Sequence, residues 1–242
     1  MRAMILAAGL GTRLRPLTND RPKALVEVNG RTLLEITVER LREFGIREVV
    51  VNVHHFPEMI SAYLKKHEDF GMSIALSPED LLLDTGGGLK KASHFFLERG
   101  SDEPFLVHNV DVLSTIDFGR MLIVHRERGA LATLAVQQRQ SSRQLLFNEK
   151  LQLCGRRTGA GADQIARAEA HAQPLAFCGI HVISPRIFGL MSEEGVFPIV
   201  DTYLRLASQG QPIVGFRADE YYWRDVGTLA NLEQAAGEAP SS

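Results

Sequence analysis

The sequence predicts an α/β fold built on a doubly wound, mostly parallel sheet. Short apolar runs alternate along the chain with segments whose apolar residues recur at helical spacing. The run 48–53 is nearly continuous in β-branched residues, which is typical of a strand covered by helices on both faces. In sheets of this kind ligands bind beside the carboxyl ends of the strands, so we expect the functional site there.

The first half of the chain follows this alternation regularly. Residues 32–35 have the pattern of a capping box before the first helix, and Gly45 is expected to end that helix. The other expected elements are helices over about 57–66 and 89–96, and strands at 4–6, 48–53, near 74–76 and at 105–109.

The second half is less regular. Strands are expected at 130–137, 175–183 and 213–218, and a helix over 199–208. Residues 138–171 are polar, with a short hairpin near 145–153. We interpret this stretch as an insertion or lid, and a plain surface excursion explains its composition equally well. A single domain is expected to span 1–236, and the small polar tail 237–242 is expected to fray.

Composition and charge exclude several classes of protein. The 242 residues include 27 Lys and Arg against 29 Asp and Glu, and the net charge of −2 offers no global attraction to nucleic acid or anionic lipid. No apolar run approaches the length of a membrane span, and no signal-peptide pattern opens the chain. Cys154 and Cys178 lack metal-ligand spacing and are expected to be buried thiols. A soluble protein of the reducing cytoplasm fits these features.

The segment after the first expected strand has the residues of a phosphate-binding loop. Gly9 and Gly11 have no side chains, so backbone N–H groups can approach an anion closely. Arg13, Arg15 and Lys23 place three cations within reach of the same loop. A dinucleotide-binding fingerprint does not fit, because leucine stands where its third glycine is needed, and no Gly-Lys-Ser/Thr follows as in a P-loop.

Residues 6–18, with the Pro-Lys pair at 22–23, resemble the signature of the sugar-1-phosphate nucleotidylyltransferases. The segment 83–88 resembles its variants in N-acetylmuramate-1-phosphate uridylyltransferases and mannose-1-phosphate guanylyltransferases. The resemblance implies a Rossmann-like nucleotidyltransferase fold, and the chain is too short for the C-terminal β-helix of some members. It also implies an enzyme of nucleotide sugar biosynthesis that transfers a nucleotidyl group from a nucleoside triphosphate to a sugar 1-phosphate and releases pyrophosphate.

The resemblance further implies roles for individual residues. Arg13 would neutralise the β- and γ-phosphates, and Lys23 would bridge the α-phosphate and the incoming sugar phosphate. These two and Asp111 are the expected catalytic residues. A solvated loop carboxylate is the alternative for Glu79. The implied nucleotide contacts are Leu6, Ala8, Gly9, Gly11, Thr12, Arg13, Glu79, Gly87 and Asn109.

Two aspartates are the implied ligands of a Mg²⁺ ion, which chemistry on a nucleoside triphosphate requires. Asp111 directly follows the strand that ends at Asn109, and the family's Asn-Gly-Asp has become Asn-Val-Asp here without loss of the carboxylate. Asp225 lies in the segment 223–228, which resembles the family's Trp-x-Asp-x-Gly-Thr. Thr228 could equally be the N-cap of a helix, and both roles can coexist.

The acceptor side carries a weaker signal. The Glu-Lys-Pro triplet that is common in the second half of the family is absent, whereas residues 177–181 resemble its Gly-Ile/Leu-Tyr strand. Gly179 is therefore expected beside the sugar, with Asp201 as a second contact. The sequence leaves the sugar and the oligomeric state unknown, and it favours UTP or GTP as the donor without deciding the base.

Two other functions stay open at this point. Enzymes that transfer a cytidylyl group to an alcohol phosphate such as phosphocholine share the opening motif, and only the weak sugar pocket speaks against them. A non-catalytic nucleotide-sensing subunit could keep the fold without the chemistry. Such a subunit would not need the metal pair, so the joint presence of Arg13, Lys23, Asp111 and Asp225 favours an enzyme.

Overall fold

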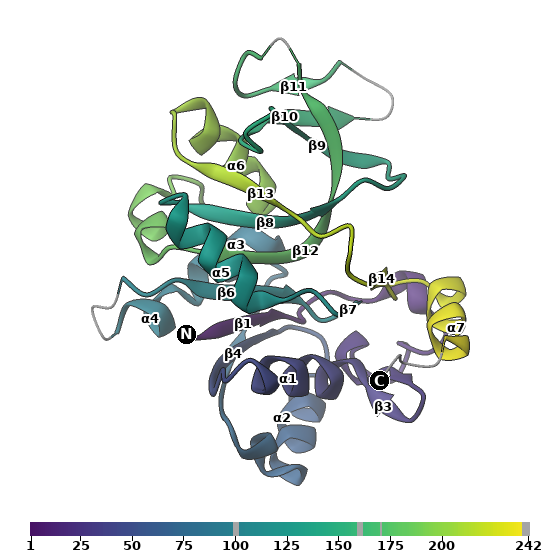
Figure 1. Cartoon of the computed structure of the whole chain (residues 1–242). Coiled ribbons are helices and arrows are strands. Elements are labelled where there is room, and N and C mark those ends of the chain that lie inside the picture. Colours follow the sequence, from purple (N-terminus) through teal and green to yellow (C-terminus); the bar gives the residue numbers. More distant parts are fainter. Residues whose placement is uncertain (99–101, 159–161, 170, 239–242) are drawn as a thin grey trace.

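The structure, a computed structural model, describes residues 1–98, 102–158, 162–169 and 171–238. Its main sheet has the strand order β11-β10-β9-β12-β6-β1-β4-β5, with β8 paired to β12 and β13 paired to β8 (Figure 1). The strands are β1 (Ala3–Leu6), β4 (Glu48–Val53), β5 (Ser73–Pro78), β6 (Phe105–Asn109), β8 (Ala132–Gln137), β9 (Arg143–Phe147), β10 (Leu153–Thr158), β11 (Gln164–Ile165), β12 (Gln173–Ile183) and β13 (Ile213–Arg217). Two small sheets pair β2 (Glu27–Val28) with β3 (Arg31–Thr32) and β7 (Val112–Ser114) with β14 (Trp223–Asp225).

Helices cover both faces of the main sheet, which confirms the doubly wound α/β class. They are α1 (Leu33–Glu43), α2 (Pro57–Lys66), α3 (Asp84–Lys91), α4 (Ser93–Leu97), α5 (Phe118–Glu127), α6 (Ile199–Ser208) and α7 (Leu229–Gly237). Ala3 and Ile5 of β1 belong to a core shared with α1, α2 and α5, whereas Met4 and Leu6 belong to a core shared with α3, α4 and α6. Successive strand residues thus point to opposite helical layers.

The strands of the first half, β5, β4, β1 and β6, are parallel to one another, as predicted. In the centre, Leu6 of β1 lies between Asn52 of β4 and Asn109 of β6. The carboxyl ends of three strands therefore meet at one edge, and the segments that follow them lie close together. This edge is where the sequence places its candidate site.

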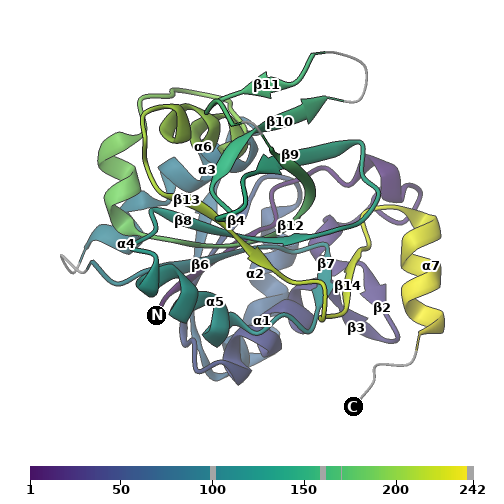
Figure 2. The same cartoon turned by 45° about the horizontal axis from the view of Figure 1, so that its top comes forward.

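The second half adds antiparallel strands beside this parallel core. The long strand β12 pairs antiparallel with β6, β8 and β9, and its pairing with β8 shifts register between Phe177 and His181. The hairpin predicted near 145–153 is formed by β9 and β10, and β9 joins it to the main sheet (Figure 2). Residues 159–161 and 170 lie outside the described residues, and the lid role of 138–171 stays a prediction.

Two helical segments differ from the prediction. The helix predicted over 89–96 starts earlier as α3 at Asp84, and α4 continues it after a break at Ala92. The three glycines at 86–88 make the sequence pattern of this helix weak. A Cβ on Gly86 would overlap Phe197, so the missing side chain allows α3 to pack against Phe197. Helix α5 was not predicted, and it begins where the Asp117 side chain accepts a hydrogen bond from the backbone of Arg120.

The C-terminal segment returns to the first half of the fold. β14 pairs with β7, so that Asp225 lies opposite Val112. Thr228 accepts a hydrogen bond from Asn231 N at 3.3 Å, which confirms it as the N-cap of α7. Of the tail predicted to fray, Gly237 belongs to α7, and 239–242 lie outside the described residues. Within the described ranges, no helix is long and apolar enough to cross a membrane.

Candidate active site

Two cavities open at the carboxyl edge of β1, β4 and β6. The smaller has a volume of about 370 Å³ and lies between the ends of β1 and β4 and the start of α3. The larger has a volume of about 1430 Å³ and extends toward β10, β12 and β14. The cavities adjoin each other along a wall of residues that line both of them. The shared wall is formed by Leu6, Asp84, Thr85, Asn109 and Asp111.

The glycine loop after β1 is held closed by its own residues. Gly11 has φ +63°, and a Cβ there would lie 2.9 Å from the Thr18 methyl group, so only glycine fits without strain. The Thr18 hydroxyl donates a hydrogen bond of 2.8 Å to the Gly11 carbonyl. Gly9 lies beside the Lys23 ammonium group, which a Cβ would approach to 3.6 Å. The loop therefore brings backbone and a cation together, as predicted for a phosphate site.

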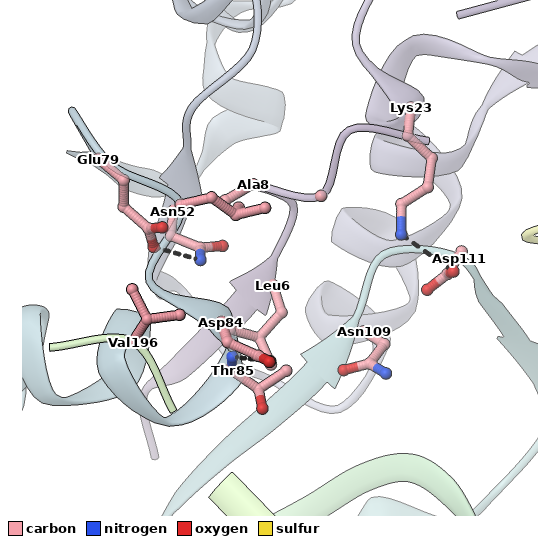
Figure 3. Close-up of a pocket in the computed structure, with 12 residues that line it drawn as sticks. Leu6, Ala8, Lys23, Asn52, Glu79, Asp84, Thr85, Asn109, Asp111 and Val196 are labelled. Carbon is pink, nitrogen blue, oxygen red and sulfur yellow. Dashed lines mark hydrogen bonds and ion pairs between the residues drawn. The ribbon is translucent and has the colours of Figure 1, made fainter. Parts of the chain in front are cut away.

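Lys23, which lines the smaller cavity, forms an ion pair with Asp111 of the shared wall (Figure 3). The Lys23 Nζ lies 2.9 Å from Asp111 Oδ2, and each side chain is only 13% exposed. In a site this shielded the two charges interact strongly, and removing either one would leave the other without its partner. The lysine and the aspartate predicted to act together are thus brought into contact.

Asp225 and Arg13 converge on the same point from another side. A Cβ built on Gly227 would lie 2.8 Å from Asp225 Oδ1, 2.9 Å from Asp111 Oδ2 and 3.0 Å from Arg13 Nη2. Gly227 is therefore surrounded by the two carboxylates and the guanidinium. The backbone supports this approach, because Val226 N donates to the Asp111 carbonyl at 2.8 Å. Residues more than one hundred positions apart form one charged cluster.

The donor set of Asp111 and Asp225 fits a magnesium ion bound largely through its substrate. Carboxylate oxygens are the ligands that Mg²⁺ prefers, and the ion commonly takes one or two of them together with phosphates and waters. No group of three or more His, Cys, Asp or Glu side chains with metal-binding geometry occurs among the described residues. A cage made only of protein ligands is thus not present there, whereas the two-carboxylate arrangement is.

At the end of the smaller cavity away from Lys23, buried polar side chains are linked by hydrogen bonds. Asn52 accepts a hydrogen bond from Ala7 N at 2.7 Å. It donates one to Glu79 Oε1 at 2.8 Å (Figure 3). The other Glu79 oxygen accepts from Leu83 N at 3.0 Å. Glu79 is 4% exposed, so its carboxylate lies within the fold and not in solvent. The predicted base contact Glu79 lines the cavity, and Asn52 fixes its position.

Several predicted nucleotide contacts line a cavity and others do not. Leu6, Ala8 and Gly9 line the smaller cavity, and Arg13 lines the larger one. In the described part of the chain, Gly11, Thr12 and Gly87 line neither cavity. At Gly87 a Cβ would overlap the Gly195 carbonyl, so the glycine admits the segment 195–197 of the protein itself. Its contact with a base stays a prediction.

The predicted sugar contacts lie in and beside the larger cavity. Gly179 lines it at the register shift of β12, with φ +71°. Asp201 forms an ion pair of 2.9 Å with Arg156, and Arg156 lines the same cavity. Asp201 thus contacts the cavity through its partner arginine, while its role toward a sugar stays a prediction.

The buried histidines and the buried thiol near the site are neutral at physiological pH. Burial lowers the pKa of His108 to about 4 and that of His181 to about 3. Burial raises the pKa of the Cys178 thiol to about 12. Cys154 and Cys178 are buried and unbridged, as predicted. The charge of the site therefore comes from its lysine, arginines and aspartates.

Asn52, Asp84 and Thr85 line the smaller cavity and were not predicted. A polar residue inside the β-branched run 48–53 was the signal that could have revealed Asn52. Asp84 has φ +60°, unusual for a residue other than glycine, and its Oδ1 accepts from Thr85 N at 2.6 Å. That conformation depends on packing against the segment 195–199, and nothing local in the sequence signals it.

Known proteins share this sequence pattern. The family model described as nucleotidyl transferase matches residues 2–145. N-acetylmuramate alpha-1-phosphate uridylyltransferase of Caulobacter vibrioides is 35% identical over 93% of this chain and 91% of its own length. Mannose-1-phosphate guanyltransferase of Yarrowia lipolytica is 31% identical over 94% of this chain, which spans 61% of the length of that protein.

The fold is shared as well. A solved structure of UDP-glucose pyrophosphorylase complexed with UDP-glucose has a TM-score of 0.78 to this chain, at 18% identity, and the match covers 98% of this chain and 97% of that one. At this identity the likeness shows the fold alone. The family match extends over more than half of the chain and includes the glycine loop, Lys23 and Asp111, and we conclude that the chain belongs to the nucleotidyl transferase family.

Proposed function

We propose that the protein transfers a nucleotidyl group from a nucleoside triphosphate to a sugar 1-phosphate and releases pyrophosphate. The observation that carries this proposal is the convergence of Lys23, Asp111, Asp225 and Arg13 at the wall between two cavities. Two substrates that must react with each other need adjoining sites with charge compensation at the junction.

The nucleoside triphosphate is assigned to the smaller cavity and the glycine loop. The hydrogen-bonded side chains of Asn52 and Glu79 support placement of the base at their end of the smaller cavity. The triphosphate would then extend to the loop, where Lys23 and Arg13 supply positive charge. Because the Lys23 ammonium lies beside Gly9 and is paired with Asp111 of the shared wall, it can contact both the α-phosphate and a second phosphate bound at that wall.

The sugar 1-phosphate is assigned to the larger cavity, with its phosphate at the shared wall. One phosphate oxygen of the sugar phosphate attacks the α-phosphorus and forms the new P–O bond. The bond between the α-phosphorus and the bridging oxygen breaks, and pyrophosphate departs with that electron pair. Lys23 and Arg13 neutralise the charge on the phosphates, so the reaction needs no covalent enzyme intermediate.

Asp111 and Asp225 would hold a Mg²⁺ ion, which when bound withdraws charge from the phosphate oxygens. The ion pair with Lys23 orients the Asp111 carboxylate. The hydrogen bond from Gly227 N to Asp225 Oδ1, of 2.7 Å, orients the second carboxylate in the same way. Both aspartates are thereby held ready on the cavity wall.

For the donor we propose UTP or GTP, and for the acceptor a hexose or N-acetylhexosamine 1-phosphate. The relatives described above act, by their names, as uridylyl- and guanylyltransferases on N-acetylmuramate 1-phosphate and mannose 1-phosphate. The segment 83–88, which resembles those of the same two groups, forms the start of α3 beside the smaller cavity. These observations support the donor choice but leave one base to be selected by experiment.

A pyrophosphate-release assay tests the proposal. Purified protein is incubated with each common nucleoside triphosphate and a panel of sugar 1-phosphates and phosphocholine, with Mg²⁺ or with EDTA, and products are identified by mass spectrometry. A Mg²⁺-dependent UDP- or GDP-sugar is the expected product. CDP-choline as the only product would overturn the sugar proposal, and CDP- or dTDP-sugars would overturn the donor assignment alone.

A further inference from the structure

The larger cavity contains an arginine that neither the motifs nor the proposed mechanism uses. Arg139 follows β8, and its guanidinium carbon lies 3.7 Å from the centroid of the Trp223 ring. Its Nη2 donates a hydrogen bond of 2.9 Å to the Phe177 carbonyl, at the register shift of β12. Stacking and this hydrogen bond fix the guanidinium in one place on the cavity wall.

Among the described residues, Arg139 forms no ion pair with an acidic residue, whereas two arginines of the same cavity do. Arg156 pairs with Asp201, and Arg224 pairs with Glu238. For Arg139, the described residues provide no carboxylate oxygen within 4.0 Å, and its buried Nε has no hydrogen-bond acceptor. The neighbouring Cys178 thiol is neutral at physiological pH because burial raises its pKa to about 12. The guanidinium charge is thus not neutralised by a contact of the protein.

Arg40 provides a comparison elsewhere in the same chain. It also lies over an aromatic ring, 4.7 Å from the Phe44 centroid, donates to a backbone carbonyl and has a buried Nε without an acceptor. Arg40, however, forms an ion pair of 3.0 Å with Glu43 and lines neither of the two cavities. Arg40 thus combines ring stacking and a carbonyl contact with an acidic partner, in a place where no ligand is expected. Arg139 has the same two contacts but, within the described part of the chain, no acidic partner.

The position of Arg139 relates it to the reacting groups. Trp223, on which it stacks, and Asp225 belong to the same short strand β14. Trp223 Nε1 donates to the Cys178 carbonyl at 2.7 Å, next to Gly179. Arg139 and Trp223 thus hold consecutive carbonyls of β12 and form one wall of the larger cavity beside the carboxylate pair. Burial lowers the pKa of Arg139, and the nearby Cys178 and Asp225 oppose this effect only in part, so a bound anion would offset the remaining cost of burying the charge.

We propose that Arg139 binds an oxyanion of the acceptor and so determines acceptor affinity. The inference rests on the proposed function, because it takes the larger cavity as the acceptor site. The planar guanidinium suits a phosphate or a carboxylate equally. The oxyanion is therefore either the 1-phosphate that every acceptor carries or a carboxylate that only some sugars carry.

The test compares wild type, Arg139→Gln and Arg139→Lys with Arg40→Gln as the matched control. Acceptors are used in pairs of which one member carries a carboxylate: N-acetylglucosamine and N-acetylmuramate 1-phosphates, which differ by a lactyl ether, and glucose and glucuronic acid 1-phosphates, which differ at C6. In Arg139→Gln, we expect the acceptor KM to rise at least tenfold while the nucleotide KM changes less than twofold. Arg139→Lys keeps the positive charge but lacks the planar guanidinium, so its acceptor KM should lie between those of the wild type and Arg139→Gln. Arg40→Gln should leave both KM values unchanged.

The acceptor pairs distinguish the two oxyanions. A similar rise for neutral and acidic acceptors assigns Arg139 to the phosphate, whereas a rise for the acidic acceptors alone assigns it to the carboxylate. Unchanged acceptor KM values, or an equal rise in the KM of both substrates with a lower Tm, would show that Arg139 only braces β12 and would overturn the inference.

Failure of the proposed function is recognised separately, as absence of product from the wild type with every substrate pair. In that event, calorimetric titration of the same four sugar phosphates into wild type and Arg139→Gln still tests the arginine. At least tenfold weaker binding to the variant is expected for the acidic members or for all four. Equal affinities would overturn the inference.

Discussion

Gly179 lies directly opposite Asn109, where a Cβ on the glycine would be 2.7 Å from the Asn109 amide nitrogen. Gly179 has φ +71°, and Asn109 ends the central strand β6. The glycine therefore allows β12 to pass close to the wall shared by the two cavities. Both residues line the larger cavity, so their spacing sets the shape of the site where donor and acceptor would meet.

Gly179→Ala is expected to lower both stability and activity. A positive φ costs alanine about 1 kcal/mol, and contact with Asn109 adds to this unless the amide moves. Gly210→Ala is the control, because Gly210 has φ +82° but no atom within 4 Å of its Cβ position. Urea unfolding should show a larger loss for Gly179→Ala than for Gly210→Ala, and only the former should raise the acceptor KM. Equal losses and equal kinetics would show that the approach to Asn109 has no consequence.

Asp111→Asn and Asp225→Asn are each expected to abolish most turnover while the fold is retained. Each substitution removes one charge from the carboxylate pair around Gly227 and changes the side-chain volume little. The measurement is kcat across a Mg²⁺ titration, with circular dichroism as the check on folding. Asp20→Asn, at an exposed aspartate paired with Arg21, is the control and should behave as wild type. Near-normal kcat in either site variant would remove that aspartate from the proposed metal site.

Local patterns predicted the core of the fold, and the family motifs predicted site residues that the structure brings close together. The β-branched run of β4 and the apolar runs of β1 and β6 indicated buried parallel strands, and such strands place Leu6 and Asn109 at a common edge. The family motifs then indicated that Lys23, Asp111 and Asp225 belong together. The ion pair and the two carboxylates around Gly227 agree with that prediction in geometry.

What local patterns could not predict depends on contacts between distant segments. β12 pairs antiparallel with three strands that lie beside it in the fold. The alternation of apolar and polar residues along a strand does not specify which strand becomes its neighbour. Arg139 and Trp223 are 84 positions apart, so nothing in either segment reveals their stacking. The same holds for α3, whose glycines fit a helix only because Phe197 packs against them.

Stability is expected to fall as the pH is lowered from about 7 to 4. Burial lowers the pKa of His125 to about 4, and its ring nitrogens are hydrogen-bonded to Thr133 and Ser184. Between pH 4 and 6.5 the unfolded chain binds a proton at this histidine and the folded protein does not, so acid favours unfolding. At pH 5 this amounts to about 2 kcal/mol for each such buried histidine.

Urea unfolding at pH 7.5 and 5.0 measures this dependence. His125→Asn, which lies away from both cavities, should be less stable at pH 7.5 and should lose less stability on acidification than the wild type. His94→Asn is the control, because His94 is exposed and no buried imidazole is removed. An unchanged pH dependence in His125→Asn would mean that this side chain is not the source of the effect.

Lys23→Ala is expected to lower kcat/KM by about 10²-fold or more, which corresponds to about 2.7 kcal/mol or more of transition-state stabilisation. The physical reason is that its ammonium, shielded from solvent beside Asp111 and Gly9, is the cation placed to contact two phosphates at once. Steady-state kinetics with the preferred donor and acceptor measure the loss, and Lys66→Ala at an exposed position of α2 is the control. Because the substitution also leaves Asp111 without its partner, Tm is measured in parallel. A lower Tm with unchanged kcat/KM would assign Lys23 to the fold alone, whereas a kinetic loss larger in kcat than in the nucleotide KM is the outcome required of a group that acts in the transition state.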